Sequence, residues 1–256
     1  MEAYTGFAYV YDKFMADMPY QQWAELIAKR LAQKGVLPGE SQIAELGCGT
    51  GMFSIELAKI GYGIIGIDNS EDMLVQANMN MCEQEAASDN EADSLQIVYT
   101  LQDMTEFELP YEADGVVSVC DSMNYLVEAD SLAKCFESVW RSLRQGGVFI
   151  FDMKKEAFYR DVLADNTFSD CMEDCAYIWN NYYNADEMLN EYELSVFVKC
   201  DDGRYERYDE YHVQRAYMTK DVIELLRGAG FIDAEAFEED AGEDNHERIY
   251  FRAVKP

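Results

Sequence analysis

The sequence predicts an α/β fold, in which a mostly parallel sheet carries helices on both faces. Short apolar runs alternate along the chain with segments whose apolar residues recur at helical spacing, as in successive βαβ units. A glycine-rich turn follows the first apolar run, and an aspartate ends the second one. Between residues 177 and 215, alternating residues and an Asp-Gly pair predict antiparallel strands instead. We therefore expect a parallel core with an antiparallel insertion.

The glycine-rich turn lies in residues 45–51, which read Glu-Leu-Gly-Cys-Gly-Thr-Gly. Ile43 and Ala44 precede it, and apolar residues at helical spacing follow it from Phe53 onward. Glycine suits such a turn because it adopts positive φ and leaves room for a ligand beside the backbone. A helix that begins here offers unpaired N–H groups to that ligand. This is the layout of the cofactor-binding first turn of an α/β sheet.

The spacing of the glycines restricts which class of cofactor the turn can bind. A dinucleotide fingerprint, G-x-G-x-x-G, would need glycine where Met52 stands, and Gly51 comes one position early. A Walker loop would need a lysine, and none occurs between Lys34 and Lys59. The remaining pattern is E-x-G-x-G-x-G, which an ordinary strand-to-helix turn can also contain.

The second apolar run, residues 62–67, ends in Asp68, and Ser70 then stands where a helix N-cap is expected. Asp68 follows the first glycine by about twenty residues, where a carboxylate can accept hydrogen bonds from both hydroxyls of a ribose. An aspartate that only caps a turn would look the same. Because nicotinamide enzymes also place an acid here, Asp68 supports an adenosine ligand without choosing the cofactor.

Three later segments complete the pattern. Each is an apolar run of strand length followed by polar residues, and they begin at Leu95, Gly115 and Val148. The last belongs to the run L-R-x-G-G-x-F-I-F-D, residues 143–152, which follows an amphipathic helix over residues 131–143.

These motifs, in this order over about 110 residues, resemble those of class I S-adenosylmethionine-dependent methyltransferases. The resemblance covers nearly the whole chain. It implies a Rossmann-like seven-stranded mixed sheet with helices on both faces, whose last strand, residues 249–254, runs antiparallel between its neighbours. It also implies S-adenosyl-L-methionine as the cofactor and S-adenosyl-L-homocysteine as the product.

The resemblance also assigns cofactor contacts to individual residues. Asp68 would bind the ribose, Asp103 would receive the adenine amino group, and Met104 would pack on the adenine ring. The full set of implied cofactor-binding residues is Glu45, Gly47, Cys48, Gly49, Gly51, Asp68, Asn69, Met73, Asp103, Met104, Cys120, Asp121 and Tyr4. No metal site is indicated, because the soft ligands Cys171 and Cys175 lack two further partners.

Three residues are candidates for catalysis. The pattern Y-x-x-F-A-x-V-Y-D, residues 4–12, resembles the start of small-molecule methyltransferases, in which this segment folds over the cofactor. Tyr11, like Tyr4, could therefore touch the methionine moiety or the acceptor, or simply pack on the first helix. Tyr125 follows the fourth strand, at the edge where the transferred methyl should point. The third candidate, Arg215, stands where the chain returns from the insertion.

The predicted insertion spans residues 154–215, with residues 1–153 and 216–256 as the cofactor-binding core. We expect about three antiparallel strands that stand beside the carboxyl edge of the main sheet as a wall or lid. This arrangement resembles small-molecule N-methyltransferases that act on amines, including the glycine and amino-sugar types. We expect Arg215 and Tyr217, where the chain returns to the core, to face the pocket. Glu210 and His212 share the strand parity of Tyr208 and could line the same face, although a lone strand histidine is more often only packed.

The amino-acid composition restricts the classes of molecule that the protein is expected to bind. With 20 basic and 50 acidic residues, the formal charge is −30, which disfavours nucleic acid and favours cationic or amine substrates. No apolar run reaches membrane-spanning length, and the N-terminus lacks a signal segment. The seven cysteines are expected to be reduced residues of a cytoplasmic protein.

The predicted function is methyl transfer from S-adenosylmethionine to a small-molecule acceptor, preferably an amine, by direct in-line displacement. Since the cofactor is already activated, the protein supplies alignment, a dry pocket and electrostatics. Two alternatives stay open: a catalytically silent S-adenosylmethionine sensor, and a nicotinamide-dependent oxidoreductase, which Met52 disfavours. Neither the atom methylated (N, O or C) nor the oligomeric state follows from the sequence.

Overall fold

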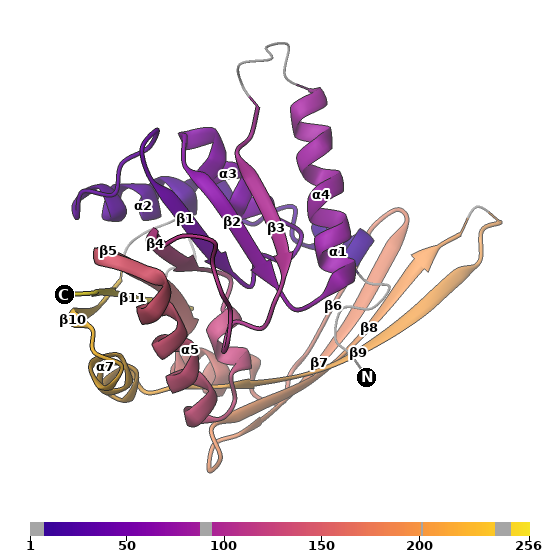
Figure 1. Cartoon of the computed structure of the whole chain (residues 1–256). Coiled ribbons are helices and arrows are strands. Elements are labelled where there is room, and N and C mark those ends of the chain that lie inside the picture. Colours follow the sequence, from indigo (N-terminus) through magenta and orange to yellow (C-terminus); the bar gives the residue numbers. More distant parts are fainter. Residues whose placement is uncertain (1–7, 88–93, 201, 239–246) are drawn as a thin grey trace.

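The computed structural model describes residues 8–87, 94–200, 202–238 and 247–256, which form two sheets (Figure 1). Sheet A has seven strands in the order β10-β11-β5-β4-β1-β2-β3. In chain order these are β1 (Gln42–Leu46), β2 (Gly63–Asp68), β3 (Ile97–Leu101), β4 (Ala113–Ser118), β5 (Leu143–Lys154), β10 (Ile232–Phe237) and β11 (Arg248–Val254). β11 is antiparallel to both β5 and β10, and the other neighbouring pairs are parallel. The predicted seven-stranded mixed sheet is confirmed.

Helices cover both faces of sheet A. α2 (Tyr20–Ala32) and α3 (Met52–Ile60) pack on one face, and α5 (Ala129–Ser142) and α7 (Thr219–Gly228) pack on the other. α4 (Glu71–Ala86) stands beside β3 (Figure 1). Neighbouring residues of one strand serve opposite layers: Val116 joins the α5/α7 side, whereas Val117 joins the α2/α3 side. This two-sided burial explains why the central strands read as continuous apolar runs.

Sheet B is a separate antiparallel sheet of four strands in the order β6-β7-β8-β9. Its strands are β6 (Thr167–Cys171), β7 (Cys175–Asn184), β8 (Leu189–Lys199) and β9 (Tyr205–Arg215), reached from β5 through α6 (Glu156–Phe158) and the π-helical turn η3 (Tyr159–Leu163). The expected number of about three strands is thus corrected to four. β6 escaped prediction because it is short and its side chains are mostly exposed, so no alternation marks it. The Asp-Gly turn is confirmed, with Gly203 at φ +82°.

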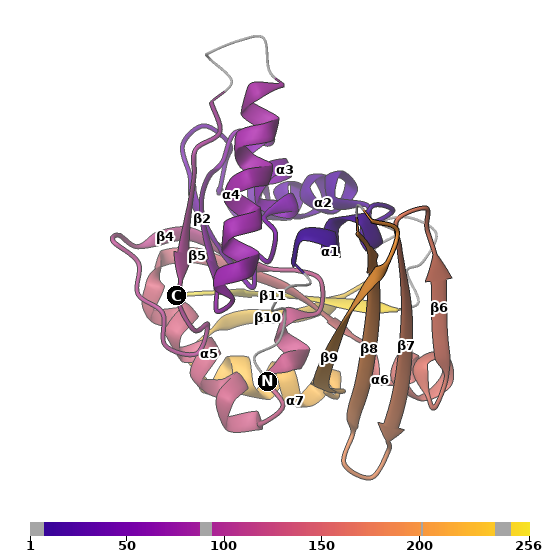
Figure 2. The ribbon, with the colours of Figure 1, turned by 90° about the vertical axis from the view of Figure 1, so that its right-hand side faces the viewer.

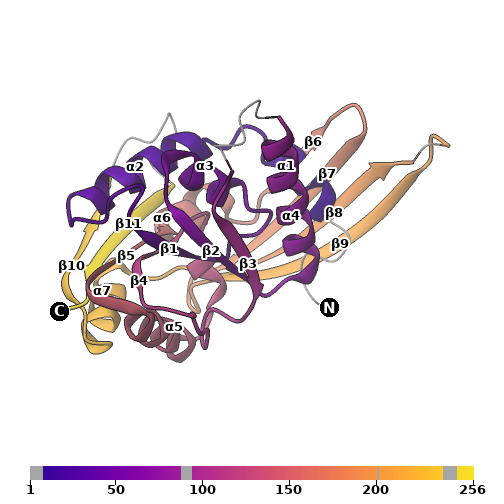
Figure 3. The same cartoon turned by 45° about the horizontal axis from the view of Figure 1, so that its top comes forward.

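α1 (Ala8–Phe14) lies next to sheet B, as Figures 2 and 3 both show. Val10 of α1 is completely buried in a small cluster with Val196 and Val198 of β8. This packing brings the N-terminal helix between the two sheets, near the carboxyl ends of the parallel strands. In the part of the chain that the structure describes, no helix combines the length and the apolar character needed to cross a bilayer.

Candidate active site

A cavity of about 1100 Å³ opens where the carboxyl ends of β1, β2 and β4 meet α1 and sheet B. One end is lined by the glycine-rich turn and the residues that follow β2 and β3. The other end is lined by side chains from the inner face of sheet B, namely Tyr177, Trp179, Tyr192, Leu194 and His212. The cavity is therefore shared by the two sheets, and the insertion does form one of its walls.

The glycine-rich turn has the backbone that only glycine adopts readily. Gly47, Gly49 and Gly51 have φ angles of +68°, +52° and +77°. A Cβ on Gly51 would lie 2.2 Å from the Tyr99 hydroxyl, so this glycine is required by packing. A Cβ on Gly49 would meet nothing within 4 Å, although Gly49 lines the cavity. The open face of Gly49 is thus a place where a ligand can approach the backbone.

Asp68 joins this turn to the start of α4. Its Oδ2 accepts a hydrogen bond from the Gly49 N–H at 2.8 Å, and its Oδ1 accepts one from the Ser70 N–H at 2.9 Å. Ser70 is the N-cap of α4, as predicted, and its Oγ accepts from the Met73 N–H. Burial raises the pKa of Asp68 above its usual range. Because each carboxylate oxygen keeps a second lone pair, Asp68 can still accept two ribose hydroxyls.

Glu45 lies beneath the turn and is 2% exposed. It accepts a hydrogen bond from the Ser54 hydroxyl, and it lines the cavity. Burial, with a smaller contribution from the charge of Asp68, raises the pKa of Glu45 to about 8. A buried carboxyl group of this kind is a favourable neighbour for a cationic ligand such as a sulfonium, because a positive charge nearby stabilises the ionised form.

The residues after β3 line the same end of the cavity. Asp103 Oδ1 accepts hydrogen bonds from the Thr105 N–H at 2.7 Å and from the Thr105 hydroxyl at 2.8 Å, which fixes the carboxylate. Met104 lines the cavity beside Asp103, as do Asn69 and Met73 from the start of α4. A carboxylate next to flexible apolar side chains fits an adenine ring and its amino group.

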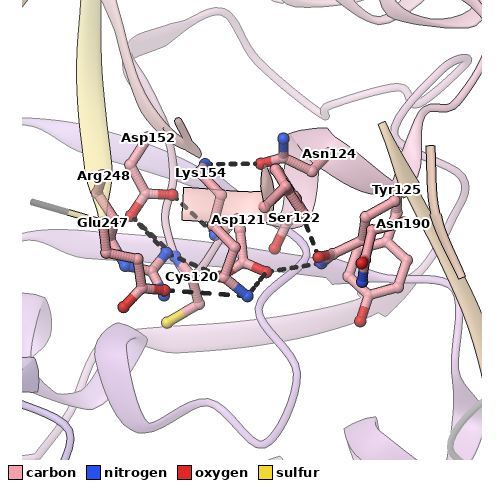
Figure 4. Close-up of polar contacts among 12 residues, drawn as sticks. Cys120, Asp121, Ser122, Asn124, Tyr125, Asp152, Lys154, Asn190, Glu247 and Arg248 are labelled. Atoms are coloured by element: carbon pink, nitrogen blue, oxygen red, sulfur yellow. Dashed lines mark hydrogen bonds and ion pairs between the residues drawn. The ribbon is translucent and has the colours of Figure 1, made fainter. Parts of the chain in front are cut away.

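A buried polar cluster forms the floor where β4 ends (Figure 4). Asp121 Oδ1 lies 2.8 Å from Arg248 Nη1, and Asp121 Oδ2 accepts from Lys154 Nζ at 3.1 Å and from Gln214 Nε2 at 2.7 Å. Burial by itself would raise the pKa of Asp121, but the charges of Lys154 and Arg248 outweigh it and lower that pKa. Asp121 is therefore a fixed anion that links β4, β5, β11 and β9.

Tyr125, in the 3₁₀ turn η2 (Ser122–Tyr125), reaches across the cavity to sheet B. Its hydroxyl lies 2.5 Å from the hydroxyl of Tyr192. The Tyr192 ring stacks on His212, with ring centroids 4.7 Å apart. Burial lowers the pKa of His212 to about 4, so the imidazole is neutral at pH 7. This end of the cavity consequently presents aromatic rings and neutral hydroxyls.

α1 closes the cavity and is attached at both sides. Asp12 accepts hydrogen bonds from the hydroxyl of Thr50, which belongs to the glycine-rich turn, and from Asn80 Nδ2 of α4. On the other side, Lys13 pairs with Asp174 at the β6–β7 turn, and the Phe14 ring packs edge-on against Tyr177. Tyr11 of the same helix lines the cavity.

The structure brings most of the predicted site residues together. Those that line the one cavity are Glu45, Gly47, Cys48, Gly49, Asp68, Asn69, Met73, Asp103, Met104, Cys120, Asp121, Tyr11 and Tyr125. Gly51 does not line it, because its α-carbon faces Tyr99. Tyr4 lies outside the described residues.

Arg215 is not among the cavity-lining residues. Its guanidinium donates to the carbonyl of Val127 and to that of Glu187 at 2.9 Å, so it joins the end of β9 to the loop after η2. Tyr217 likewise donates to the Leu126 carbonyl. Both residues thus hold backbone segments together at the base of sheet B, and neither faces the pocket.

The sequence motifs did not predict several of the residues that line the cavity. Lys154 and Arg248 lie opposite one another on β5 and β11, a pairing that depends on contacts between distant segments. Trp179 and Tyr192 share the inner face of sheet B with His212, and their strand parity could have grouped them. Within the described ranges, no three His, Cys, Asp or Glu side chains are placed to hold a metal ion.

Comparisons with known proteins agree with this geometry. The family described as "Methyltransferase domain" matches residues 43–147. The candidate methyltransferase YqeM of Bacillus subtilis (strain 168) is 36% identical over 257 residues, which cover 98% of this chain and 97% of YqeM. A crystal structure of an S-adenosylmethionine-dependent methyltransferase from Clostridium acetobutylicum ATCC 824 aligns with a TM-score of 0.81, at 27% identity and 97% coverage of both chains.

A second solved structure shares the fold. It is S-adenosylmethionine-bound CalS10, an amino pentose methyltransferase from Micromonospora echinaspora, with a TM-score of 0.72, 15% identity and 100% coverage of both chains. The glycine-rich turn, the carboxylate after β2, the sheet order and the nearly full-length similarity to YqeM lead to one conclusion: this chain belongs to the class I S-adenosylmethionine-dependent methyltransferases.

Proposed function

We propose that this methyltransferase transfers the methyl group of S-adenosylmethionine to a small-molecule amine by direct in-line displacement. The observation that carries the proposal is the division of one cavity into two ends, a cofactor end around Asp68 and an aromatic end around Tyr192. Tyr125 and Asp121 stand between these ends. A methyl group on a sulfonium bound at the first end would point toward an acceptor held at the second.

The cofactor end supplies the groups that the ligand needs. We propose that Asp68 binds the ribose hydroxyls and that Asp103 and Met104 hold the adenine. We also propose that the ligand packs directly against the backbone of Gly49, where no side chain lies in the way. Glu45 would offset the sulfonium charge from below. The cofactor contributes an activated methyl group, so these residues act by binding and alignment.

The aromatic end suits an amine that arrives neutral. Burial among aromatic rings lowers the pKa of a bound amine and so exposes its lone pair. The aromatic rings of Trp179, Tyr192 and Tyr177, which line this end, would then stabilise the positive charge that develops on nitrogen as the methyl group is transferred. The amino pentose methyltransferase that shares this fold acts on a sugar that carries an amine, which supports this class of acceptor. The formal charge of −30 supports the same class and disfavours a nucleic-acid partner.

We also propose a cytoplasmic location, since all seven cysteines are free thiols and reduced cysteines are typical of that compartment.

The test is turnover of S-adenosylmethionine with a panel of primary amines, secondary amines, alcohols and carbon acids, followed as formation of S-adenosylhomocysteine. We expect turnover with amines only, with a rate that rises as pH increases through the pKa of the free amine. Binding of S-adenosylmethionine is measured separately by calorimetry. Tight cofactor binding without turnover on any acceptor would favour the sensor, and turnover confined to alcohols or carbon acids would refute the amine.

A further inference from the structure

The backbone at the end of β4 is held in a rare conformation. Cys120 and Asp121 are consecutive non-glycine residues with φ angles of +60° and +55°. Residues other than glycine seldom adopt this left-handed backbone conformation, and they keep it only where surrounding contacts enforce it. Both residues line the cavity, and the strained pair leads directly into η2, which carries Ser122 and Tyr125.

One carboxylate receives both N–H groups of the strained pair. Asp152, near the end of β5, accepts from the Cys120 N–H at 3.2 Å and from the Asp121 N–H at 2.8 Å. Its side chain is fully buried. Successive N–H groups in a turn form a concavity that binds an anion, and here Asp152 is that anion. The φ and ψ angles of Cys120 set the angle between the two N–H groups, so a single carboxylate that accepts from both of them favours the left-handed conformation of Cys120.

Arg248 from β11 completes the arrangement. Its Nη1 lies 3.2 Å from Asp152 Oδ2 and 2.8 Å from Asp121 Oδ1, so one guanidinium nitrogen joins the two carboxylates. Figure 4 shows Asp152, Arg248 and Asp121 directed toward one another. The side chain of Asp121, turned this way, meets Gln214 from sheet B. The position of the strained turn is thus tied to both walls of the cavity.

We propose that Asp152 is a positioning residue of the cofactor site: its carboxylate holds residues 120–121 in the left-handed conformation that places Cys120, Asp121 and Ser122 in the cavity wall. Asp152 does not itself line the cavity, so it acts through these residues. The Ser122 hydroxyl lies 3.4 Å from the Gly47 carbonyl, which connects the turn to the glycine-rich segment. The proposal rests on the cofactor assignment and is independent of the acceptor.

The proposal is tested with a double-mutant cycle on S-adenosylhomocysteine affinity, measured by calorimetry. D152N leaves one acceptor oxygen and places an NH₂ group against a backbone N–H, so we expect the dissociation constant to rise about tenfold. Glycine adopts positive φ without strain, so in the C120G variant residue 120 can keep its left-handed conformation without the Asp152 carboxylate. The effect of D152N should therefore be much smaller in the C120G chain than in the natural chain.

D114N is the matched control. Asp114 also accepts a backbone N–H, that of Gln42 at 2.8 Å, and pairs with an arginine, Arg144, but it lies away from the cavity. We expect its substitution to leave the dissociation constant unchanged. Equal effects of D152N in both backgrounds would overturn the proposal, because a general loss of stability does not depend on residue 120. Wild-type affinity in D152N would overturn it as well.

A second measurement needs no substitution at Asp152. In the natural chain with S-adenosylhomocysteine bound, the amides of Cys120 and Asp121 should exchange slowly with solvent deuterium, because both are hydrogen-bonded to a buried carboxylate. Exchange at the rate of an unprotected loop would overturn the proposal, even if D152N failed to fold. Failure of the acceptor panel would leave both measurements interpretable, since neither uses an acceptor.

Discussion

The hydroxyl groups of Tyr125 and Tyr192 lie 2.5 Å apart, although one residue follows β4 of sheet A and the other belongs to β8 of sheet B. The contact spans the cavity at the boundary between its cofactor end and its aromatic end. It therefore fixes the distance between the two walls at the place where we expect the acceptor nucleophile to lie.

Removal of one hydroxyl should weaken acceptor methylation selectively. For Y192F we expect a loss of about fivefold in kcat/KM, since one buried hydrogen bond contributes about 1 kcal/mol, while the cofactor dissociation constant stays unchanged. Y211F is the matched control, because Tyr211 lies on the exposed side of the next strand and bonds Glu191 instead. Equal losses in both variants, measured with the best acceptor of the panel, would contradict the placement.

Asp68→Ala should weaken S-adenosylhomocysteine binding by about 2 kcal/mol or more, because charge-assisted hydrogen bonds to the ribose are lost. The variant also loses the hydrogen bonds to Gly49 and Ser70, so its melting temperature should fall. Calorimetry gives the affinity and thermal unfolding gives the stability. D161A, an exposed aspartate on η3, serves as the control. An unchanged dissociation constant for D68A would refute our placement of the ribose.

Gly49→Ala and Gly35→Ala separate backbone strain from ligand contact. Both glycines have positive φ, and a Cβ on either meets nothing within 4 Å. We expect each alanine to cost about 1 kcal/mol of folding free energy through strain alone. Only G49A should also abolish cofactor binding, because its methyl group would occupy the face that the ligand approaches. Urea unfolding and calorimetry check the two effects, and normal cofactor affinity in G49A would show that the ligand lies elsewhere.

The pKa of Glu45 predicts a specific pH dependence of stability. The folded-state pKa of about 8 lies above the ordinary value of 4.5, so the folded chain binds the proton more tightly than the unfolded chain. This contribution is complete below pH 4.5 and is lost as pH rises toward 8, by up to about 1.4 kcal/mol per pH unit. The free energy of unfolding of E45Q, followed from pH 5 to 8 without cofactor, should fall less steeply than that of the natural chain. Parallel pH profiles would show that Glu45 is ionised throughout.

Short sequence motifs predicted the backbone features at the cofactor end of the cavity. Positive φ at Gly47 and Gly49, an N-cap at Ser70 and an acid at the end of β2 are all requirements of neighbouring backbone, so short motifs encode them. The seven-stranded mixed sheet followed from the family resemblance, because the motifs of that family recur here in the same order along the chain. The expected last strand, antiparallel between its neighbours, is β11.

The acceptor end was less predictable because it depends on how two sheets meet. The strand register sets His212 opposite Tyr192 on one face of sheet B, a pairing that the sequence analysis did not predict, and only the packing of sheet B decides which face adjoins the cavity. The expected inward position of Arg215 was not found, since nearby carbonyls at the base of the sheet attract its guanidinium. Asp152 had been identified only as the end of a strand motif. Its hydrogen bonds to the N–H groups of residues 120 and 121 depend on a positive-φ backbone conformation that no pattern in the sequence predicted.

The attachments of α1 have a consequence for the catalytic cycle. This helix is fastened to the nucleoside side through Asp12 and to the opposite wall through Lys13, so spent product cannot leave past it without breaking one of them. The Lys13 pair is solvent-exposed and sensitive to ionic strength, whereas the Asp12 contacts are partly sheltered. Added salt should therefore accelerate turnover wherever escape of S-adenosylhomocysteine, rather than the chemical step, limits the rate.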